Sequence, residues 1–218
     1  MSRAMSHRSG HPDRRSRAAH LGPVARRPLV LDAALAVWDR HGYAGATTAA
    51  IAEEAGVSKP VLYECYSTKD AILFALLDRE EERLMAAVAA AVPSAIDPEH
   101  PEHTFRQMYV TFFTAVLGDP MSWRVFLDAG RTVPRALQQR VAEGREVSVA
   151  GIAALLDTFT VEQGRPMSPR ELHLRAELLV TLVEKNALLL LSQEPGPDAW
   201  TVEDLAEVTT RIALQGWA

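Results

Sequence analysis

The chain has 218 residues, of which 48% are hydrophobic and 23% charged, a composition that excludes a disordered or fibrous protein. No apolar run approaches the roughly 20 residues of a membrane span, and the N-terminus lacks the apolar segment of a secretory signal. The net charge is −5, and a single cysteine, Cys65, excludes an internal disulfide, so we expect a cytoplasmic protein.

The charge is distributed unevenly along the chain. Residues 1–27 carry seven arginines against one aspartate, for a net charge of +6. Residues 28–75 carry three basic and six acidic side chains (−3), and residues 76–218 carry 13 basic and 21 acidic ones (−8). Residues 1–27 also have almost nothing apolar to bury, which predicts a disordered basic arm that meets a polyanionic partner.

A series of short helices is predicted after this arm. Apolar residues at 3–4 residue spacing begin at Pro28 and end at Gly42, which suits a helix C-terminus. Thr47 or Thr48 caps a second helix, and Gly56 ends it. A third helix runs from Ser58 to Tyr66, and Thr68 opens a fourth that ends near Val92.

The pattern of apolar residues and prolines also predicts helices in the rest of the chain. They are predicted near 101–117, 120–129, 134–159, 169–193 and 201–214. Ser168 and Glu171 form a capping box before the strongly apolar helix at 169–193. Neither an alternating strand pattern nor an internal repeat is present in the sequence, so the predicted fold is all-α.

The second and third helices, joined by a glycine turn, have the pattern of a helix-turn-helix, whose second helix lies in a DNA major groove. Leu62 and Tyr66 would hold that helix to the core, leaving Lys59, Pro60, Tyr63 and Glu64 outward. Tyrosine hydroxyl and lysine ammonium groups can reach phosphates, and a proline ring can contact a thymine methyl group.

From about Val30 to Leu76 the sequence resembles the TetR family of bacterial transcriptional regulators. The resemblance is carried by the spaced residues VL-AA--VW---GY, by the Thr47–Thr48 pair with Ile51 and Ala52, and by AGVSKPVLY with the following STKD. It implies a dimer that reads a palindromic operator through an N-terminal three-helix domain. It also implies a larger C-terminal helical domain that binds a small molecule and dimerises through its last two long helices.

Two positions depart from the family pattern. Position 65, usually His or Tyr, is Cys, which is too short for a phosphate contact, and position 38, usually Phe, is Trp.

The expected domains are the arm 1–27, a DNA-binding domain 28–75, and an effector-binding and dimerisation domain 76–218. The expected DNA-binding residues are Arg26, Arg27, Thr47, Thr48, Ser58, Lys59, Pro60, Tyr63, Glu64 and Lys69.

The C-terminal domain offers candidates for a ligand pocket and for the dimer interface. Small residues within the helix at 134–159 leave room either for close helix packing or for a ligand between helices, and aromatic side chains would supply the walls. The candidate pocket residues are Phe105, Tyr109, Phe112, Trp123, Phe126, Gly144, Ser148 and Gly151. The candidate interface residues are Leu179, Val183, Leu189 and Leu190.

Other clusters are weaker candidates for sites. Cys65 is read as a small packed residue rather than a redox sensor. Glu99, His100, Glu102 and His103 are read as a solvated turn rather than a metal site, and His173, Glu177 and Glu184 as a solvated stripe rather than a site for a cationic ligand. The sequence therefore predicts neither a metal nor another cofactor.

The leading hypothesis is a DNA-binding repressor released by a small apolar or amphipathic effector. A regulator without an effector is the nearest alternative. An all-α enzyme or small-molecule carrier with a vestigial helix-turn-helix is the alternative from another class. The sequence has no nucleophile–base pair, phosphate loop or HExxH motif, so we expect no enzymatic activity.

Overall fold

The computed structural model describes residues 22–215, except for the side chains at 128–132 and 215. The described residues form helices and connecting turns without any strand, and the chain divides into two compact units between Leu76 and Leu77. Of the arm predicted at residues 1–27, residues 1–21 lie outside the described part of the chain. Among the described helices, none is both long and apolar enough to cross a membrane.

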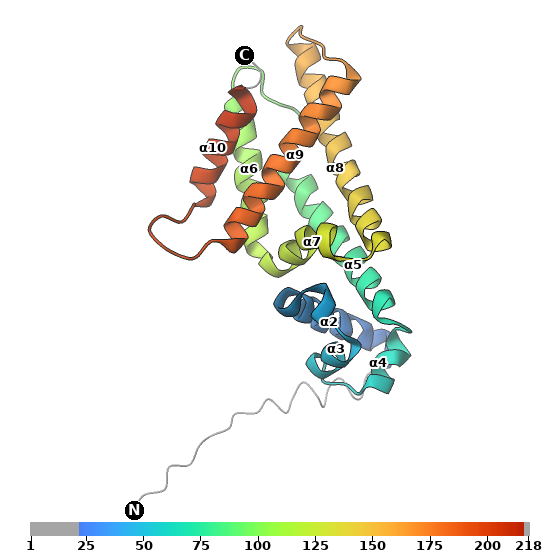
Figure 1. Ribbon diagram of the computed structural model, residues 1–218. Coiled ribbons are helices and arrows are strands. Elements are labelled where there is room, and N and C mark those ends of the chain that lie inside the picture. The colour runs from blue at the N-terminus through green and yellow to red at the C-terminus, as the bar shows by residue number, and fades with distance from the viewer. Residues whose placement is uncertain (1–21, 216–218) are drawn as a thin grey trace, which may run out of the picture. The chain divides into compact units, whose positions relative to one another are not determined.

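The first unit contains α2 (Pro23–Gly45), α3 (Thr48–Glu54), α4 (Lys59–Cys65) and the first turns of α5 (Lys69–Ala91) (Figure 1). Its core is built from fully buried apolar side chains, among them Val30, Trp38, Ile51, Leu62 and Ile72. Gly42 adopts a left-handed φ of 66° and interrupts α2 near its end, where the sequence predicts a helix terminus.

The start of α2 differs from the prediction. The helix begins at Pro23 rather than at Pro28, so residues 23–27 belong to the folded unit and not to a disordered arm. Pro23 occupies the first turn, where a missing N–H costs nothing. Contacts between the first turn of α2 and α4, described below, hold this extension in place.

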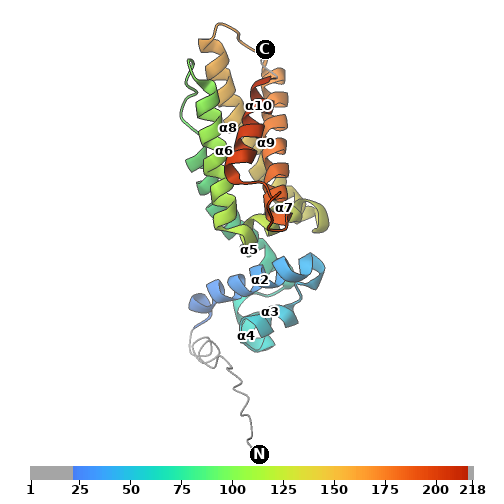
Figure 2. The same ribbon diagram turned by 90° about the vertical axis from the view of Figure 1, so that its left-hand side faces the viewer.

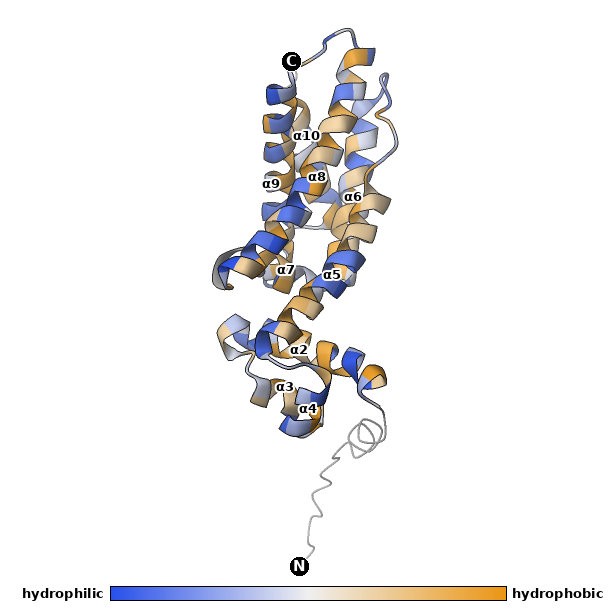
Figure 3. Ribbon diagram, turned by 90° about the vertical axis from the view of Figure 1, so that its right-hand side faces the viewer, coloured by the Kyte–Doolittle hydropathy of each residue, from blue (hydrophilic) through white to orange (hydrophobic). Residues whose placement is uncertain are grey.

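The second unit contains the rest of α5 together with α6 (Pro101–Gly118), α7 (Pro120–Thr132), α8 (Arg135–Glu162), α9 (Pro169–Ser192) and α10 (Val202–Gln215). Helices α6, α8, α9 and α10 run alongside one another, with α10 packed on α6 and α8 on α9 (Figure 2). Hydrophobic and hydrophilic residues alternate along the helices of both units, as expected for helices with one buried side (Figure 3).

A buried carboxylate joins α5 to α7 within this unit. Glu80 accepts a hydrogen bond from the Ser122 hydroxyl at 2.8 Å and pairs with Arg79 and Arg83 at 2.6 and 3.0 Å. Because both of its oxygens have charged or polar partners, the burial of this charge is compensated. The network fixes the start of α7, which supplies part of the cavity described below.

Candidate nucleic-acid interface and ligand cavity

The joint between α3 and α4 is a tight helix-turn-helix. Thr47 is the N-cap of α3, and its side chain accepts a hydrogen bond from the Ala50 amide at 3.2 Å. Gly56 follows α3 with a φ of 68°, a conformation that costs glycine little, and the Val57 amide then donates to the Ala52 carbonyl at 2.9 Å. Ser58 stands at the N-cap position of α4 without a side-chain capping bond.

One side of α4 is buried and the other is exposed. Leu62 and Cys65 lie in the core, whereas Lys59, Pro60 and Tyr63 are exposed to solvent. Tyr63 is 48% exposed, and its hydroxyl lies 3.5 Å from the Thr48 hydroxyl of α3. The hydroxyl groups and the lysine therefore share a surface formed by the two short helices, and they suit contacts with a phosphate backbone.

Arg26 and Arg27 fasten the first turn of α2 to α4. Arg26 is only 6% exposed, and its guanidinium pairs with Glu64 at 3.4 Å. Arg27 Nε donates to the Cys65 carbonyl at 3.3 Å, and its guanidinium lies 5.7 Å from the centre of the Tyr66 ring. The burial of Arg26 contradicts its expected place in a disordered DNA-contacting arm, because its charge is used within the unit.

Lys69 is held at the N-terminus of α5 by Tyr43. Its ammonium donates to the Tyr43 carbonyl at 2.7 Å and lies 4.0 Å from the centre of the Tyr43 ring. The Tyr43 hydroxyl in turn donates to Asp70 at 3.3 Å. Burial lowers the pKa of Lys69, although the Asp70 charge acts in the opposite direction. The ammonium group therefore has a fixed position beside the helix-turn-helix.

Cys65 is a buried side chain of the core. Its Sγ lies 3.5 Å from the Val61 carbonyl and 3.7 Å from the Pro23 carbonyl, at the start of α2. The thiol thus faces the interior of the unit rather than the exposed side of α4. This placement agrees with a packing role and leaves no phosphate contact to this position.

An apolar cavity lies within the second unit, bounded by α5, α6, α7, α8 and α9. It holds about 100 Å³ of free volume and is partly open to solvent. The structure places six of the eight residues predicted for a pocket on its wall. These six are Phe105, Tyr109, Phe112, Trp123, Phe126 and Ser148.

The two predicted glycines do not line this cavity. A methyl group at Gly144 would lie 2.3 Å from a carboxylate oxygen of Glu81, so the absent side chain makes room for Glu81 rather than for a ligand. Gly151 is exposed and has open space around it. Small residues in a helix indicate an unusual environment, but the sequence alone does not tell which neighbour lies there.

Three of the four predicted interface residues contact their own unit. Leu179 and Val183 line the cavity, and Leu190 is only 5% exposed. Leu189, which is 39% exposed, is the one that remains on the outer surface. The apolar pattern of α9 could not distinguish a cavity wall from a subunit interface, because both require the same residue types.

Arg145 lies at the centre of a polar cluster in the cavity wall. The sequence did not single out this residue. Its guanidinium contacts Glu177 at 2.7 Å, Glu184 at 3.0 Å and the Thr181 hydroxyl at 2.8 Å. Burial raises the pKa of the Glu184 carboxyl, while the Arg145 charge partly opposes that shift. Glu177 and Glu184, which the sequence predicts to lie on a solvated stripe, are therefore partners of a cation from the same chain.

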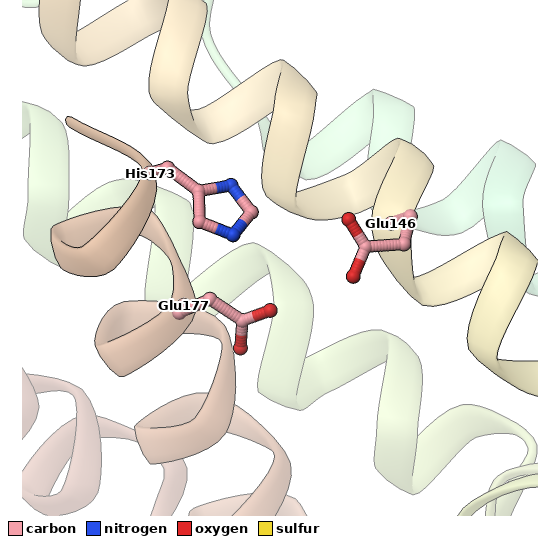
Figure 4. A group of neighbouring side chains, drawn as sticks. All are labelled: Glu146, His173 and Glu177. Atoms are coloured by element: carbon pink, nitrogen blue, oxygen red, sulfur yellow. The ribbon is translucent and has the colours of Figure 1, made fainter. Parts of the chain in front are cut away.

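His173 and Glu177 of α9 face Glu146 of α8 on the outside of this wall (Figure 4). Their ligand atoms lie within 4.8 Å of one another. A divalent cation there would compete with Arg145 for Glu177, and two of the three side chains are exposed. In the turn before α6, His100 contacts Glu102 at 3.4 Å and lies beside the His103 ring.

Comparison with known proteins assigns the first unit to a family. Residues 30–76 match the family described as bacterial regulatory proteins, tetR family. The crystal structure of a TetR-like transcriptional regulator from Rhodococcus sp. RHA1 is similar along almost the whole chain, with a TM-score of 0.71 and 26% identity over 91% of this chain and 98% of that one. The chain belongs to the TetR family.

Two further similarities place this TetR-family chain among known proteins. A crystal structure from Pseudomonas aeruginosa shares the fold, with a TM-score of 0.73 and 24% identity over 94% of this chain and 96% of that one. The HTH-type transcriptional activator FasR of Mycolicibacterium smegmatis is 33% identical over 103 residues, or 47% of this chain. This match spans 46% of FasR, about half its length.

Proposed function

We propose that this TetR-family chain is a ligand-responsive transcriptional repressor. In this proposal it binds a palindromic operator as a dimer and is released when a small apolar or amphipathic molecule enters the cavity. Helices α2 to α4 and the start of α5 would bind DNA, and the unit that begins at Leu77 would bind the ligand and dimerise.

The observation that carries the ligand-responsive part is the cavity. Protein interiors are normally packed to high density, and unfilled apolar space lowers the free energy of unfolding. Here large side chains such as Phe105, Phe112 and Trp123 surround about 100 Å³ of free volume without filling it. A ligand that occupies this space recovers the lost packing, which supports a role in binding an apolar molecule.

The surface of α3 and α4 supports the DNA-binding part. Exposed Lys59, Pro60 and Tyr63 occupy the outer side of the second helix of a helix-turn-helix, the side that enters the major groove in such folds. Tyr63 and Lys69 suit phosphate contacts, which position the protein, and Lys59 and Pro60 suit contacts with bases. Two such surfaces related by a twofold axis would match a palindrome.

The outer side of α9 and α10 supports the dimer. Leu174, Leu178 and Leu189 of α9 and Ile212 of α10 are exposed apolar side chains. A second subunit that covers them would remove this apolar surface from water.

DNA binding is tested by gel retardation with the DNA upstream of the chain's own coding sequence. We expect retardation at low salt and a footprint with two inverted half-sites. Tyr63→Phe should weaken binding to this DNA and to unrelated DNA by a similar factor, because a phosphate contact carries no sequence information. Lys59→Ala should instead change the preference between the two DNAs.

Two results would contradict this assignment. One is the absence of retardation at low salt, which would favour a carrier or an enzyme over a regulator. The other is a Tyr63→Phe variant with altered sequence preference and unchanged overall affinity.

A transcriptional activator is the second candidate, because FasR is described as one. Deleting the gene and measuring transcripts from the bound promoter separates the two. Transcripts should rise if the chain is a repressor and fall if it is an activator.

A further inference from the structure

The first turn of α2 lies outside the part of the chain that matches the tetR family. The matched residues begin at Val30, whereas α2 begins at Pro23. Residues 23–27 nevertheless contact α4, the second helix of the helix-turn-helix, through the Pro23 carbonyl and the side chains of Arg26 and Arg27. What this turn does to α4 is therefore not implied by membership of the family.

One of these contacts reaches the exposed side of α4. Nη1 of Arg26 lies 3.4 Å from Oε2 of Glu64, whose side chain is 57% exposed, while Arg26 itself is buried. Glu64 follows Pro60 by four residues, so the two lie on one line along the helix, on the side that we propose to enter the major groove. A buried cation thus holds one oxygen of a carboxylate on the proposed DNA-binding surface.

A carboxylate on this surface weakens binding to every DNA unless it contacts a base, because the phosphates repel it. Its two oxygens offer about four lone-pair positions, so the bond to Arg26 leaves room for a second donor. In the major groove cytosine presents its N4 amino group as a donor, whereas adenine presents a donor beside the N7 acceptor. Glu64 is therefore suited to accept a hydrogen bond from cytosine.

We propose that Glu64 selects a cytosine in each half-site of the operator and that Arg26 is the positioning residue that orients its carboxylate. The inference rests on the proposed DNA-binding function. It adds the identity of one base in the half-site, and it gives the first turn of α2 a role in sequence preference. Because Arg26 is buried, it acts through Glu64.

The test selects bound duplexes from a random-sequence DNA library with the purified full-length chain. The wild type should enrich cytosine at one symmetric position of each half-site. Glu64→Gln should shift that position toward adenine, because glutamine pairs with adenine N6 and N7. The preference for cytosine over adenine there should fall roughly tenfold or more, and the other positions should keep their preferred bases.

Two variants of Glu64 separate base readout from a simple link between α2 and α4. Glutamine keeps the side-chain length and still offers Arg26 an acceptor oxygen, so the melting temperature of Glu64→Gln should change little. Glu64→Ala should lose the cytosine preference and bind unrelated DNA severalfold more tightly than the wild type, because a negative charge near the phosphates is gone. A simple link predicts the same preferred sequence for all three proteins.

The role of Arg26 is tested by its own variants. Arg26→Met fills much of the same buried space but leaves the Glu64 carboxylate without its cation, so the cytosine preference should weaken severalfold at that position. Arg26→Lys should restore part of it. Arg27→Met is the matched control, because Arg27 lies in the same turn but donates to the Cys65 carbonyl. That variant should keep the cytosine preference.

The same preferred sequence for the wild type and Glu64→Gln would overturn the inference, and so would a wild-type sequence without a symmetric cytosine. Either result leaves the DNA-binding function intact. A cytosine preference that survives in Arg26→Met would remove the positioning role of Arg26. A wild type that enriches no sequence and retards no DNA at low salt would overturn the proposed function and this inference together.

Discussion

Gly144 and Gly151 stand two turns apart on α8 in opposite surroundings. Gly144 is buried against the carboxylate of Glu81, and Glu81 also accepts a hydrogen bond from Arg140 at 3.0 Å. A Cβ at position 144 would push this carboxylate away from Arg140. Gly151 is exposed, and nothing lies within 4 Å of the position that its Cβ would take.

Replacing each glycine by alanine should therefore change stability in opposite directions. Gly151→Ala should raise the free energy of unfolding by about 1 kcal/mol, because alanine is the better helix former and meets no obstacle. Gly144→Ala should lower it, because displacement of Glu81 outweighs the same gain. Urea denaturation of both variants measures the difference. An equal increase in the two variants would show that Glu81 moves aside freely.

The inner and outer sides of α9 have different roles. Leu179, Val183 and Leu190 face the interior of the unit, while Leu178 and Leu189 are exposed. The apolar run Ala187–Leu191 therefore serves two surfaces at once, one within the subunit and one available to a partner.

Aspartate at two adjacent positions should separate these roles. Leu189→Asp should give a folded monomer, since it places a charge on the proposed interface without disturbing the interior. Leu190→Asp should instead unfold the chain, because it buries an unpaired charge. Light scattering after size-exclusion chromatography and circular dichroism measure the two outcomes. A dimeric Leu189→Asp variant of normal stability would place the interface elsewhere.

The sequence predicts helix positions well where local chemistry sets them. Ser168 caps α9 as expected and Thr201 caps α10 in the same way, each accepting a hydrogen bond from the amide three residues later. The start of α2 was predicted five residues late, because its first turn depends on contacts of Arg26 and Arg27 with residues 38 positions away. Such contacts leave no periodic signal in the sequence.

The cavity could be predicted only in part for a related reason. The aromatic residues of α6 and α7 form a group in the sequence that predicts a pocket wall. Arg145, Leu179 and Val183 also line the cavity, but their sequence pattern is the same as that of an ordinary helix surface.

For the full chain, we expect the charge of the segment that precedes Gly22 to have the largest effect on DNA binding. Residues 1–21 carry five arginines and one aspartate, a net charge of +4, whereas residues 28–75 are net negative. Because Arg26 and Arg27 have partners inside the first unit, the arginines at 3, 8, 14, 15 and 17 are the candidates for extra phosphate contacts.

Deleting residues 1–21 should make DNA binding less dependent on salt. Each phosphate that a cation neutralises adds about −0.9 to the slope of log affinity against log salt concentration. If three arginines engage DNA, the slope should flatten by roughly three units with little change in sequence preference. The control is a full-length variant in which glutamine replaces the five arginines, because it removes the positive charges and keeps the length of the segment. An unchanged slope would mean that this segment makes no contact with DNA.

The position of Cys65 has a consequence for how the first unit opens. Its thiol lies beside the Pro23 carbonyl, beneath the first turn of α2. A reagent in solution reaches that sulfur only when this turn lifts away from α4, so the modification rate follows the opening equilibrium of the α2 N-terminus. Because the chain contains one cysteine, every modification event reports on that single local unfolding step.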